Sequence, residues 1–364
     1  MLKVLELFAG IGACSKALER LGIEHEIVDA VEIDKFAIKS FNAIHNTNFE
    51  PQDITKWDKD IECDLIMHGS PCQDFSIAGK QAGGDEGSGT RSSLMYETLR
   101  IVEKLRPKYV IWENVKNILS RRHIHNFEEY LKEMDKLNYF SFFKVLNAKD
   151  YGIPQNRERV FTLSIRKDIA IEMFQWNLFF IDSDNIFPKP IKLEKRLKDV
   201  MENNVEEKYY LSKEKLDMIS KWKCYEKPLE HIMSNQSIAR TITTRVGADC
   251  GGMKLLAIKT ANKQGYDLAT NGDGVDLVYP SSTTRRGRVG HGVSKTITAT
   301  PSQGVVDNYK IRKLTPKECF RLMGFDDEDY EKASKVCSES QLYKQAGNSI
   351  VVNVLEQILS NVLE

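Results

Sequence analysis

Apolar and polar positions follow two periodicities in turn along residues 3–165, which predicts strands alternating with helices. The first apolar run, 3–8, is β-prone and ends at a glycine turn, after which apolar residues recur at helical spacing up to Gly22. The same rhythm predicts further strands at 26–31, 63–67, 109–112, 140–146 and 160–165, a strand-like element ending near 53–55, and helices at 94–105 and 127–137. Such alternation is typical of an α/β fold, whose ligands bind at the carboxyl ends of the strands.

The pattern changes after Phe187, where prolines open a basic and mixed-charge stretch. Short β-like runs then alternate with Gly, Asn and Asp turns up to 309, and two Thr-rich segments, 237–245 and 294–300, resemble each other. The chain ends in an amphipathic helix around 350–359 that can dock on the first domain. We therefore expect a smaller, mainly β domain inserted in the first, with the boundaries 1–187 plus 341–364 for the first domain and 188–340 for the second.

Composition narrows the class of protein. A chain of 364 residues exceeds what one core normally serves, and 41% hydrophobic with 29% charged residues is ordinary for a soluble protein. No apolar run is long enough to span a membrane, and Met1–Gly10 lacks the features of a secretory signal, so a cytoplasmic protein is expected. Seven scattered cysteines without a CxxC pair argue against a disulfide framework and against a zinc site, and no metal is expected.

Charge is distributed unevenly although the formal net charge is zero. Residues 188–309 contain 20 Lys and Arg against 14 Asp and Glu, a net charge of +6, which suggests a polyanionic partner. A compact basic loop, 283–290, contains Arg285, Arg286 and Arg288 and has the composition to follow phosphates or to read guanine edges. A charge cluster of this size is also compatible with an ordinary solvated surface.

The sequence Gly69-Ser70-Pro71-Cys72-Gln73 follows the predicted strand 63–67 directly. A strand that stops at a Pro-Cys pair delivers the thiol to the carboxyl end of the sheet, which makes Cys72 a candidate nucleophile. The alternative is a small apolar residue packed in a turn. A Gly-, Ser- and Asp-rich stretch, 73–90, comes next and has the length of a lid over a site.

Other polar groups stand at predicted strand ends. Glu32 closes the second strand, where nucleotide-binding folds hold ribose hydroxyls, and Glu113 directly follows the strand 109–112. Arg157 and Arg159 are spaced to face the same way on a strand. Each of these residues is also compatible with a solvated strand end or a salt bridge, so the case for a site depends on their joint occurrence.

Together the motifs resemble those of the DNA (cytosine-5)-methyltransferase family. The matching segments, in the family's order, are FAGIG at 8–12, GSPCQDFS at 69–76, RSSL at 91–94, ENV at 113–115, QNRER at 155–159, RKLTPKECFRLMGF at 312–325 and GNSIVVNVL at 347–355. The resemblance covers the chain except its central segment. Departures are Ala13 where a second glycine is common, Ile350 where Val is common, and Glu6 where Asp is common.

The resemblance implies a Rossmann-like S-adenosylmethionine-dependent methyltransferase domain with a smaller, mainly β target recognition domain. It implies that Cys72 adds to carbon 6 of cytosine, that Glu113 contacts N3 and the exocyclic amine, and that Arg157 and Arg159 lie near O2. The cofactor-binding residues implied by the match are Phe8, Gly10, Gly12, Glu32, Ile33, Asp53, Ile54, Leu94, Asn348 and Ser349.

The implied substrate is a cytosine flipped out of double-stranded DNA. Residues expected to shape its pocket are Pro71, Gln73, Ser76, Asn114 and Gln155, and those expected to contact DNA from the second domain are Arg240, Arg245, Arg285, Arg286 and Arg288. A monomer is expected, acting either beside a restriction endonuclease or as a solitary phage enzyme. The rivals are an RNA cytosine methyltransferase, a non-catalytic DNA-binding protein and an NAD oxidoreductase, and the recognised DNA sequence cannot be read from the chain.

Overall fold

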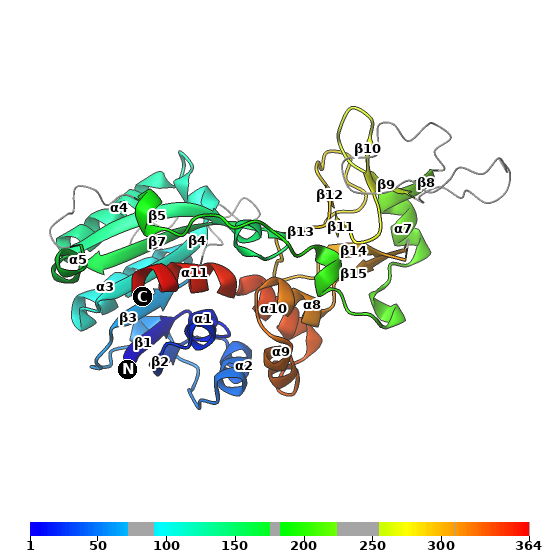
Figure 1. Cartoon of the computed structure of the whole chain (residues 1–364). Helices are drawn as coiled ribbons and strands as arrows, with labels where there is room; N and C mark the ends of the chain where they lie inside the picture. The colour runs from blue at the N-terminus through cyan, green and yellow to red at the C-terminus, as the bar shows by residue number, and fades with distance from the viewer. Residues whose placement is uncertain (72–90, 175–182, 224–254, 309, 364) are drawn as a thin grey trace. The chain divides into compact units, whose positions relative to one another are not determined.

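The structure is a computed structural model that describes residues 1–71, 91–174, 183–223, 255–308 and 310–363 (Figure 1). Contacts divide the chain into two compact units, of which unit 1 comprises 1–195, 296–301 and 315–364 and unit 2 comprises 196–295 and 302–314. The chain therefore leaves unit 1 after residue 195, returns to it briefly at 296–301 and returns again from residue 315, so unit 2 is inserted in unit 1. Residues 315–340, which the sequence assigns to the second domain, lie in unit 1.

Unit 1 is built on a six-stranded sheet in the order β2-β1-β3-β4-β7-β5. Its strands are β1 (Leu2–Leu7), β2 (His25–Val31), β3 (Leu65–His68), β4 (Tyr109–Val115), β5 (Tyr139–Asn147) and β7 (Glu158–Arg166), with the short β6 (Gln155–Asn156) before β7. The first four strands in that order pair in parallel, whereas β7 pairs antiparallel with β4, and β5 antiparallel with β7. Parallel pairing brings the carboxyl ends of β1, β3 and β4 to one edge of the sheet.

Unit 1 also contains ten helices in the part of the chain that is described. They are α1 (Ala13–Leu21), α2 (Lys35–His45), α3 (Met95–Leu105), α4 (Ile124–Lys136), α5 (Lys167–Met173), α6 (Ser183–Ile186), α8 (Pro316–Leu322), α9 (Asp327–Ser334), α10 (Glu339–Asn348) and α11 (Val352–Leu363). Short 3-10 turns are η1 (Ile54–Lys56), η2 (Arg91–Leu94), η3 (Lys116–Leu119) and η4 (Ala148–Tyr151). α1 packs against α11, so helices near the two ends of the chain lie side by side (Figure 1).

The main core of unit 1 lies between the sheet and helices α3 and α4. Buried residues of β1, β3 and β4 pack there against Met95, Ile101, Phe127 and Tyr130, with Trp112 at the centre. Consecutive residues of β1, β3 and β4 are buried, so these strands are covered on both faces and solvent is excluded from all but their ends.

Unit 2 is mainly β, with small antiparallel sheets in the orders β10-β9-β8 and β12-β11-β14-β15. Its elements are η6 (Leu197–Val200), η7 (Glu207–Tyr209), α7 (Lys213–Ile219), β8 (Ser220–Lys223), β9 (Leu255–Lys259), β10 (Tyr266–Ala269), β11 (Gly274–Asp276), β12 (Val289–Gly290), β13 (Ser294–Lys295), β14 (Gln303–Asp307) and β15 (Lys310–Lys313). Leu256, Ile258, Val275, Val306 and Ile311 form its own small hydrophobic core.

Two predicted boundaries are corrected. The strand-like element expected to end near Asp53 is absent, since the residues before η1 have no regular structure. Strand β4 continues to Val115, so Glu113 and Asn114 lie within the strand and not after it, because antiparallel pairing with β7 supplies their backbone hydrogen bonds.

Over the described residues, no helix has both the length and the apolar character needed to cross a membrane.

Candidate active site

The carboxyl edge of the sheet brings together three segments that are far apart in sequence. Leu7, the last residue of β1, is paired with His68 of β3, and His68 is paired with Trp112 of β4. The turn after β1, the Gly69-Ser70-Pro71 segment and Glu113 therefore stand next to one another. The expected residues Cys72, Gln73, Ser76, Arg240 and Arg245 lie outside the described residues.

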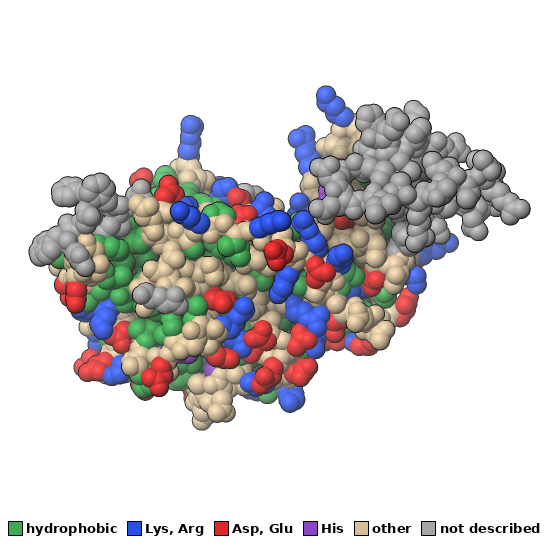
Figure 2. All heavy atoms as spheres, viewed as in Figure 1, with side chains coloured by type: hydrophobic (Ala, Val, Ile, Leu, Met, Phe, Trp, Pro, Cys, Tyr) green, Lys and Arg blue, Asp and Glu red, His purple; other side chains and the backbone are tan. Residues whose placement is uncertain are grey.

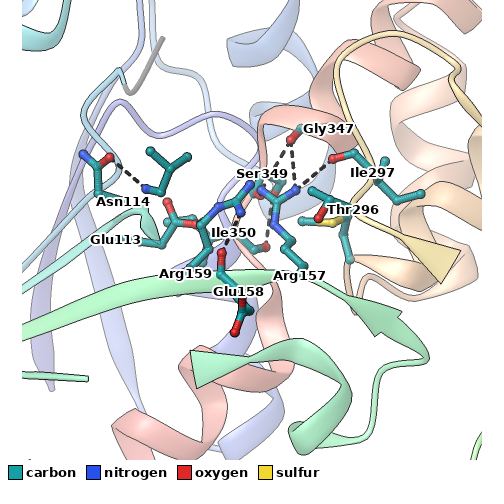
Figure 3. Close-up of polar contacts among 12 residues, drawn as sticks. Glu113, Asn114, Arg157, Glu158, Arg159, Thr296, Ile297, Gly347, Ser349 and Ile350 are labelled. Atoms are coloured by element: carbon teal, nitrogen blue, oxygen red, sulfur yellow. Dashed lines mark hydrogen bonds and ion pairs between the residues drawn. The ribbon is translucent and has the colours of Figure 1, made fainter. Parts of the chain in front are cut away.

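Glu113 and Arg159 form an ion pair, with Arg159 Nε 3.0 Å from Glu113 Oε1 (Figure 3). They come from neighbouring strands, and both side chains are largely shielded from solvent. Gly69 lies beside them, since a Cβ built on it would be 4.0 Å from Glu113 Oε2 and 3.4 Å from Ile350. A carboxyl group and a guanidinium thus share a secluded corner directly beside the segment that leads to Cys72.

Asn114 and Ser70 complete this corner through local hydrogen bonds. The side-chain Oδ1 of Asn114 accepts from Val115 N at 2.8 Å, while its buried Nδ2 has no acceptor in reach within the part of the chain that is described. Ser70 Oγ accepts from the indole N–H of Trp112 at 3.0 Å. That bond links Trp112, the neighbour of Glu113, to Ser70, the neighbour of Pro71. The ends of β3 and β4 are therefore fixed relative to each other.

Arg157, which the resemblance implies to lie near O2 of the base, bonds the backbone of unit 1 in this structure. Arg157 is only 4% exposed, and its Nη atoms donate to the carbonyls of Ile297, Gly347 and Ser349 at 2.8–3.4 Å (Figure 3). Gln155, expected to shape the substrate pocket, is fully buried, where its Nε2 donates to Leu322 O and its Oε1 accepts from Ile297 N. The two side chains hold distant segments of unit 1 together.

Gly347 shows why a glycine precedes Asn348. A Cβ on Gly347 would lie 2.1–2.4 Å from backbone atoms of Thr298 and Ala299, so α10 and the 296–301 segment approach closely only without a side chain there. Asn348 ends α10 and is exposed, and Ser349 is buried as its C-cap.

The turn after β1 contains the expected cofactor residues Phe8 and Gly10, both at positive φ (54° and 57°). Gly10 N donates to Glu32 Oε2 at 3.0 Å, so the structure brings the glycine turn and the acid after β2 together. Burial raises the pKa of Glu32 despite bonds from Asp34 N and Gly10 N. A non-glycine residue at positive φ is strained, as residues at functional sites often are.

Gly12 has a different reason to be glycine than the one expected. Its φ is 81°, and a Cβ there would lie 2.1 Å from His45 Nε2, which points at the turn and contacts Ile11 O at 3.1 Å. At Gly10, by contrast, a Cβ would meet no atom within 4 Å. The open space beside the turn is therefore at Gly10, and His45 occupies the space at Gly12.

The remaining expected cofactor residues lie around this turn. Asp53 is partly exposed, and its Oδ1 accepts from both N and Oγ1 of Thr55, bonds that lower the pKa of Asp53. Ile33 is 71% exposed, whereas Ile54 packs in the core and Leu94 lies half-buried against it. Of this set, Ile54 has the least side-chain surface available to a ligand.

Sequence reasoning missed several residues that shape the site: Glu6, Asp29, His45, Ser70 and Trp112. Glu6 is a buried carboxyl that accepts from Ser15 N at 3.0 Å, and burial raises its pKa to about 7. An acidic residue inside an apolar strand, as at Glu6 and Asp29, is a sequence signal that would have singled out two of them. The others are visible only once the chain is folded.

In unit 2 the three arginines of the basic loop 283–290 have different environments. Arg288 is 0% exposed and donates to the carbonyls of Asp276, Val278 and Tyr279, which corrects its expected contact with DNA. Arg285 pairs with Asp276 at 2.6 Å and is partly exposed, and Arg286 is exposed. Of these three arginines, Arg285 and Arg286 present a cation at the surface of the unit.

Comparison with known proteins bears on the whole chain. Residues 2–364 match the family model for C-5 cytosine-specific DNA methylases. The chain is similar to the orphan methyltransferase M.SPRI of Bacillus phage SPR (33% identity, 100% of this chain and 97% of that protein) and to the type II methyltransferase M.HhaI of Haemophilus parahaemolyticus (34%, 99% and 94%). Its fold resembles those of a DNMT2 variant from Spodoptera frugiperda (TM-score 0.62, 20% identity, 100% of both chains) and of EhMeth from Entamoeba histolytica (0.61, 16%, 99% and 97%).

Proposed function

The chain belongs to the C-5 cytosine-specific DNA methylase family and is a DNA (cytosine-5)-methyltransferase, and from that premise we propose that it methylates a cytosine within a specific short sequence of double-stranded DNA. The observation that supports the reaction in most detail is the secluded Glu113–Arg159 pair beside Gly69-Ser70-Pro71. At one corner, a carboxyl group can protonate the cytosine ring and a guanidinium can neutralise the negative charge that develops on the ring during the reaction.

The methyl donor of the family is S-adenosylmethionine, which supplies an electrophilic methyl group when bound. The residues present fit it, because a ligand can approach the backbone at Gly10, where a Cβ would meet open space. Glu32 would hold the ribose hydroxyls, the exposed Ile33 would pack on the adenine, and Asp53 would accept from its amino group through Oδ2, which Thr55 leaves available. Phe8, Leu94, Asn348 and Ser349 would complete the pocket.

Cys72 is proposed as the nucleophile. Carbon 5 of cytosine is too weak a nucleophile to take a methyl group directly, so the thiolate adds to carbon 6 and makes carbon 5 nucleophilic. After carbon 5 has gained the methyl group, a base, for which water suffices, removes the carbon 5 proton. The carbon–sulfur bond then breaks and restores both the thiolate and the aromatic ring.

Glu113 is proposed to contact N3 and the exocyclic amine of the flipped cytosine, and Arg159 to lie near O2. Protonation at N3 neutralises the charge that thiolate addition places on the ring, and the guanidinium stabilises what remains at O2. Both side chains are largely shielded from solvent, so these interactions would be stronger than in water. Asn114, whose Nδ2 is buried and points away from its own backbone bond, would donate to the base.

Unit 2 is proposed to recognise the target, with the cytosine leaving the helix to reach Cys72. Its candidates are now Arg285 and Arg286, together with Arg240 and Arg245. The enzyme is proposed to act as a monomer in the cytoplasm, either as a solitary phage-type methyltransferase, as the name of M.SPRI describes that protein, or beside a restriction endonuclease.

The nucleophile is tested by replacing Cys72 with alanine and measuring transfer of a labelled methyl group to mixed-sequence duplex DNA. We expect Cys72→Ala to abolish transfer while DNA binding persists, and Glu113→Gln to reduce transfer by about 10²–10⁴-fold. Cys63→Ser is the matched control, since Cys63 is a half-buried thiol before β3 that makes no part of the site. Full activity of Cys72→Ala would contradict the mechanism.

Substrate and target are tested by bisulfite sequencing of random DNA, and in parallel of RNA, after treatment with the enzyme and S-adenosylmethionine. We expect conversion-resistant cytosines in one short motif of duplex DNA and none in RNA. Methylation of RNA alone would refute the proposed substrate. A duplex that contains 5-fluorocytosine in that motif should become covalently attached to the wild-type enzyme, because fluorine cannot leave as a proton does.

A further inference from the structure

We propose that Asp29 is a positioning residue for adenine recognition, because its carboxylate holds both ends of the turn that carries Asp53. The inference rests on the proposed function, in which Asp53 accepts a hydrogen bond from the adenine amino group. Asp29 itself lies in strand β2 and is only 1% exposed, so it acts through protein groups and not through contact with the cofactor.

The carboxylate of Asp29 accepts three side-chain hydrogen bonds from that turn. Oδ1 accepts from Gln52 Nε2 at 2.8 Å, and Oδ2 accepts from Trp57 Nε1 at 2.8 Å and from Lys59 Nζ at 2.7 Å. Gln52 directly precedes Asp53, and Trp57 is the C-cap of η1. One buried carboxylate therefore clamps the turn on both sides of Asp53.

The same turn is tied to the rest of the proposed cofactor pocket. Gln52 N donates to Glu32 O at 2.8 Å, and Arg100 of α3 donates to the carbonyls of Ile54 and Trp57 at 3.0 and 2.9 Å. Glu32 follows β2 closely, so the strand that contains Asp29 also leads to the proposed ribose ligand. Asp29 thus fixes the distance between Glu32 and Asp53, the two acids proposed to bind the ribose and the adenine.

The charge of Asp29 is maintained by these donors. Burial alone would raise its pKa, yet the bonds from Lys59, Trp57 and Gln52 hold the pKa of Asp29 below its ordinary value. A buried carboxylate that stays ionised and fully bonded is a rigid anchor. Replacing it with an amide keeps the shape but gives the Trp57 and Lys59 donors a weaker acceptor, so the turn is held less firmly.

A purely structural role for Asp29 would lower stability without changing which base the pocket prefers. The experiment therefore compares two ligands of the full-length protein by calorimetry: S-adenosylhomocysteine and S-inosylhomocysteine, in which a carbonyl replaces the adenine amino group. We expect the wild type to prefer the adenine ligand and Asp53→Ala to lose that preference. Asp29→Asn should reduce the preference about tenfold, since one well-placed hydrogen bond is at stake.

Trp57→Phe is the second variant, because it removes one of the three donors and leaves no buried charge unpaired. It should reduce the preference in the same direction even if Asp29→Asn folds poorly. Tyr139→Phe is the control for stability. Tyr139 lies on β5, the edge strand of the sheet opposite to β2, and the variant deletes its buried hydroxyl, which donates to Pro107 O at 2.6 Å. It should lower the melting temperature and keep the wild-type preference.

Two results would overturn the inference, and they are distinguishable. If Asp53→Ala loses the preference while Asp29→Asn and Trp57→Phe keep it, Asp29 only stabilises the fold. If Asp53→Ala keeps the wild-type preference, the adenine contact of Asp53 in the proposed function is wrong, and the positioning role of Asp29 is refuted with it.

Discussion

At the scale of single residues, burial determines the protonation of two histidines in unit 1, His45 and His68. His45 packs on Phe41, with ring centroids 4.7 Å apart, and burial lowers its pKa to about 4. His68 stacks on Trp112 inside the core, and burial lowers its pKa to about 3. Both rings are neutral at physiological pH, so the bond between His45 Nε2 and Ile11 O requires the tautomer that is protonated at Nε2.

The low pKa of His45 predicts a loss of stability in acid. Between pH 6.5 and 4 the unfolded chain binds a proton at His45 that the folded chain does not, so the free energy of unfolding falls as the pH falls through this window, by up to about 3 kcal/mol. His45→Gln keeps an N–H for Ile11 O and does not titrate. Urea unfolding at several pH values should therefore show a flatter acid limb for this variant, and an identical limb would refute the assignment.

At the scale of elements, the glycine turn links β1 to α1 under three constraints. Glu6 accepts a hydrogen bond from Ser15 N in the first turn of α1, Glu32 accepts one from Gly10 N, and His45 packs against Gly12. The first turn of a helix has unpaired N–H groups, so the buried acceptor at Glu6 stabilises the start of α1. A cofactor turn is thus held from three sides before any cofactor binds.

The two glycines of this turn should respond differently to substitution. Gly12→Ala is expected to lower the free energy of unfolding by about 3 kcal/mol, because the methyl group would meet both a positive φ and the His45 ring. Gly10→Ala meets open space, so we expect only the backbone cost of about 1 kcal/mol, together with a loss of affinity for S-adenosylhomocysteine. Denaturant unfolding and calorimetry measure the two effects, and equal costs at both positions would contradict the geometry.

At the scale of the molecule, unit 1 is closed by a segment that returns after unit 2. Lys16 of α1 is only 5% exposed and pairs with Asp326 and Asp329 at 3.0 and 3.1 Å, and Arg20 pairs with Glu356 of α11 at 3.2 Å. The surface around α9 mixes acidic and basic side chains (Figure 2), yet the pair of Lys16 with Asp329 is buried and therefore matters more than exposed pairs.

Lys16→Met should destabilise the protein by about 3 kcal/mol, because it leaves the buried Asp329 carboxylate without its cation. Lys332→Met is the matched control, since Lys332 and Glu328 form an exposed pair on α9 that contributes less than about 0.5 kcal/mol. Urea unfolding of the two variants measures the difference. Equal stabilities of the two variants would show that the Lys16–Asp329 pair does not stabilise the contact between α9 and α1.

Much of the architecture was predictable from the sequence because it follows from local patterns. The periods of apolar residues located β1, α1, β2, α3, β4, α4, β7 and α11 to within a few residues, and the α/β fold with a methyltransferase-like arrangement is confirmed. The ordered motifs predicted the family and the enzyme class, which are also confirmed. The roles assigned to Cys72 and to the cofactor residues stay predictions.

The sequence by itself determined the order of elements and the residue types available at the strand ends, because hydrophobic period and chemical identity are properties of neighbouring positions. Only the tertiary structure decided which of those residues are free to react. Arg157 and Arg159 are indistinguishable as a spaced pair, yet buried carbonyls bond one guanidinium while the other faces Glu113. Asp29 likewise binds Gln52 and Trp57 only when the turn at 52–59 packs against β2. Hydrogen bonds between segments that are distant in sequence depend on the tertiary fold.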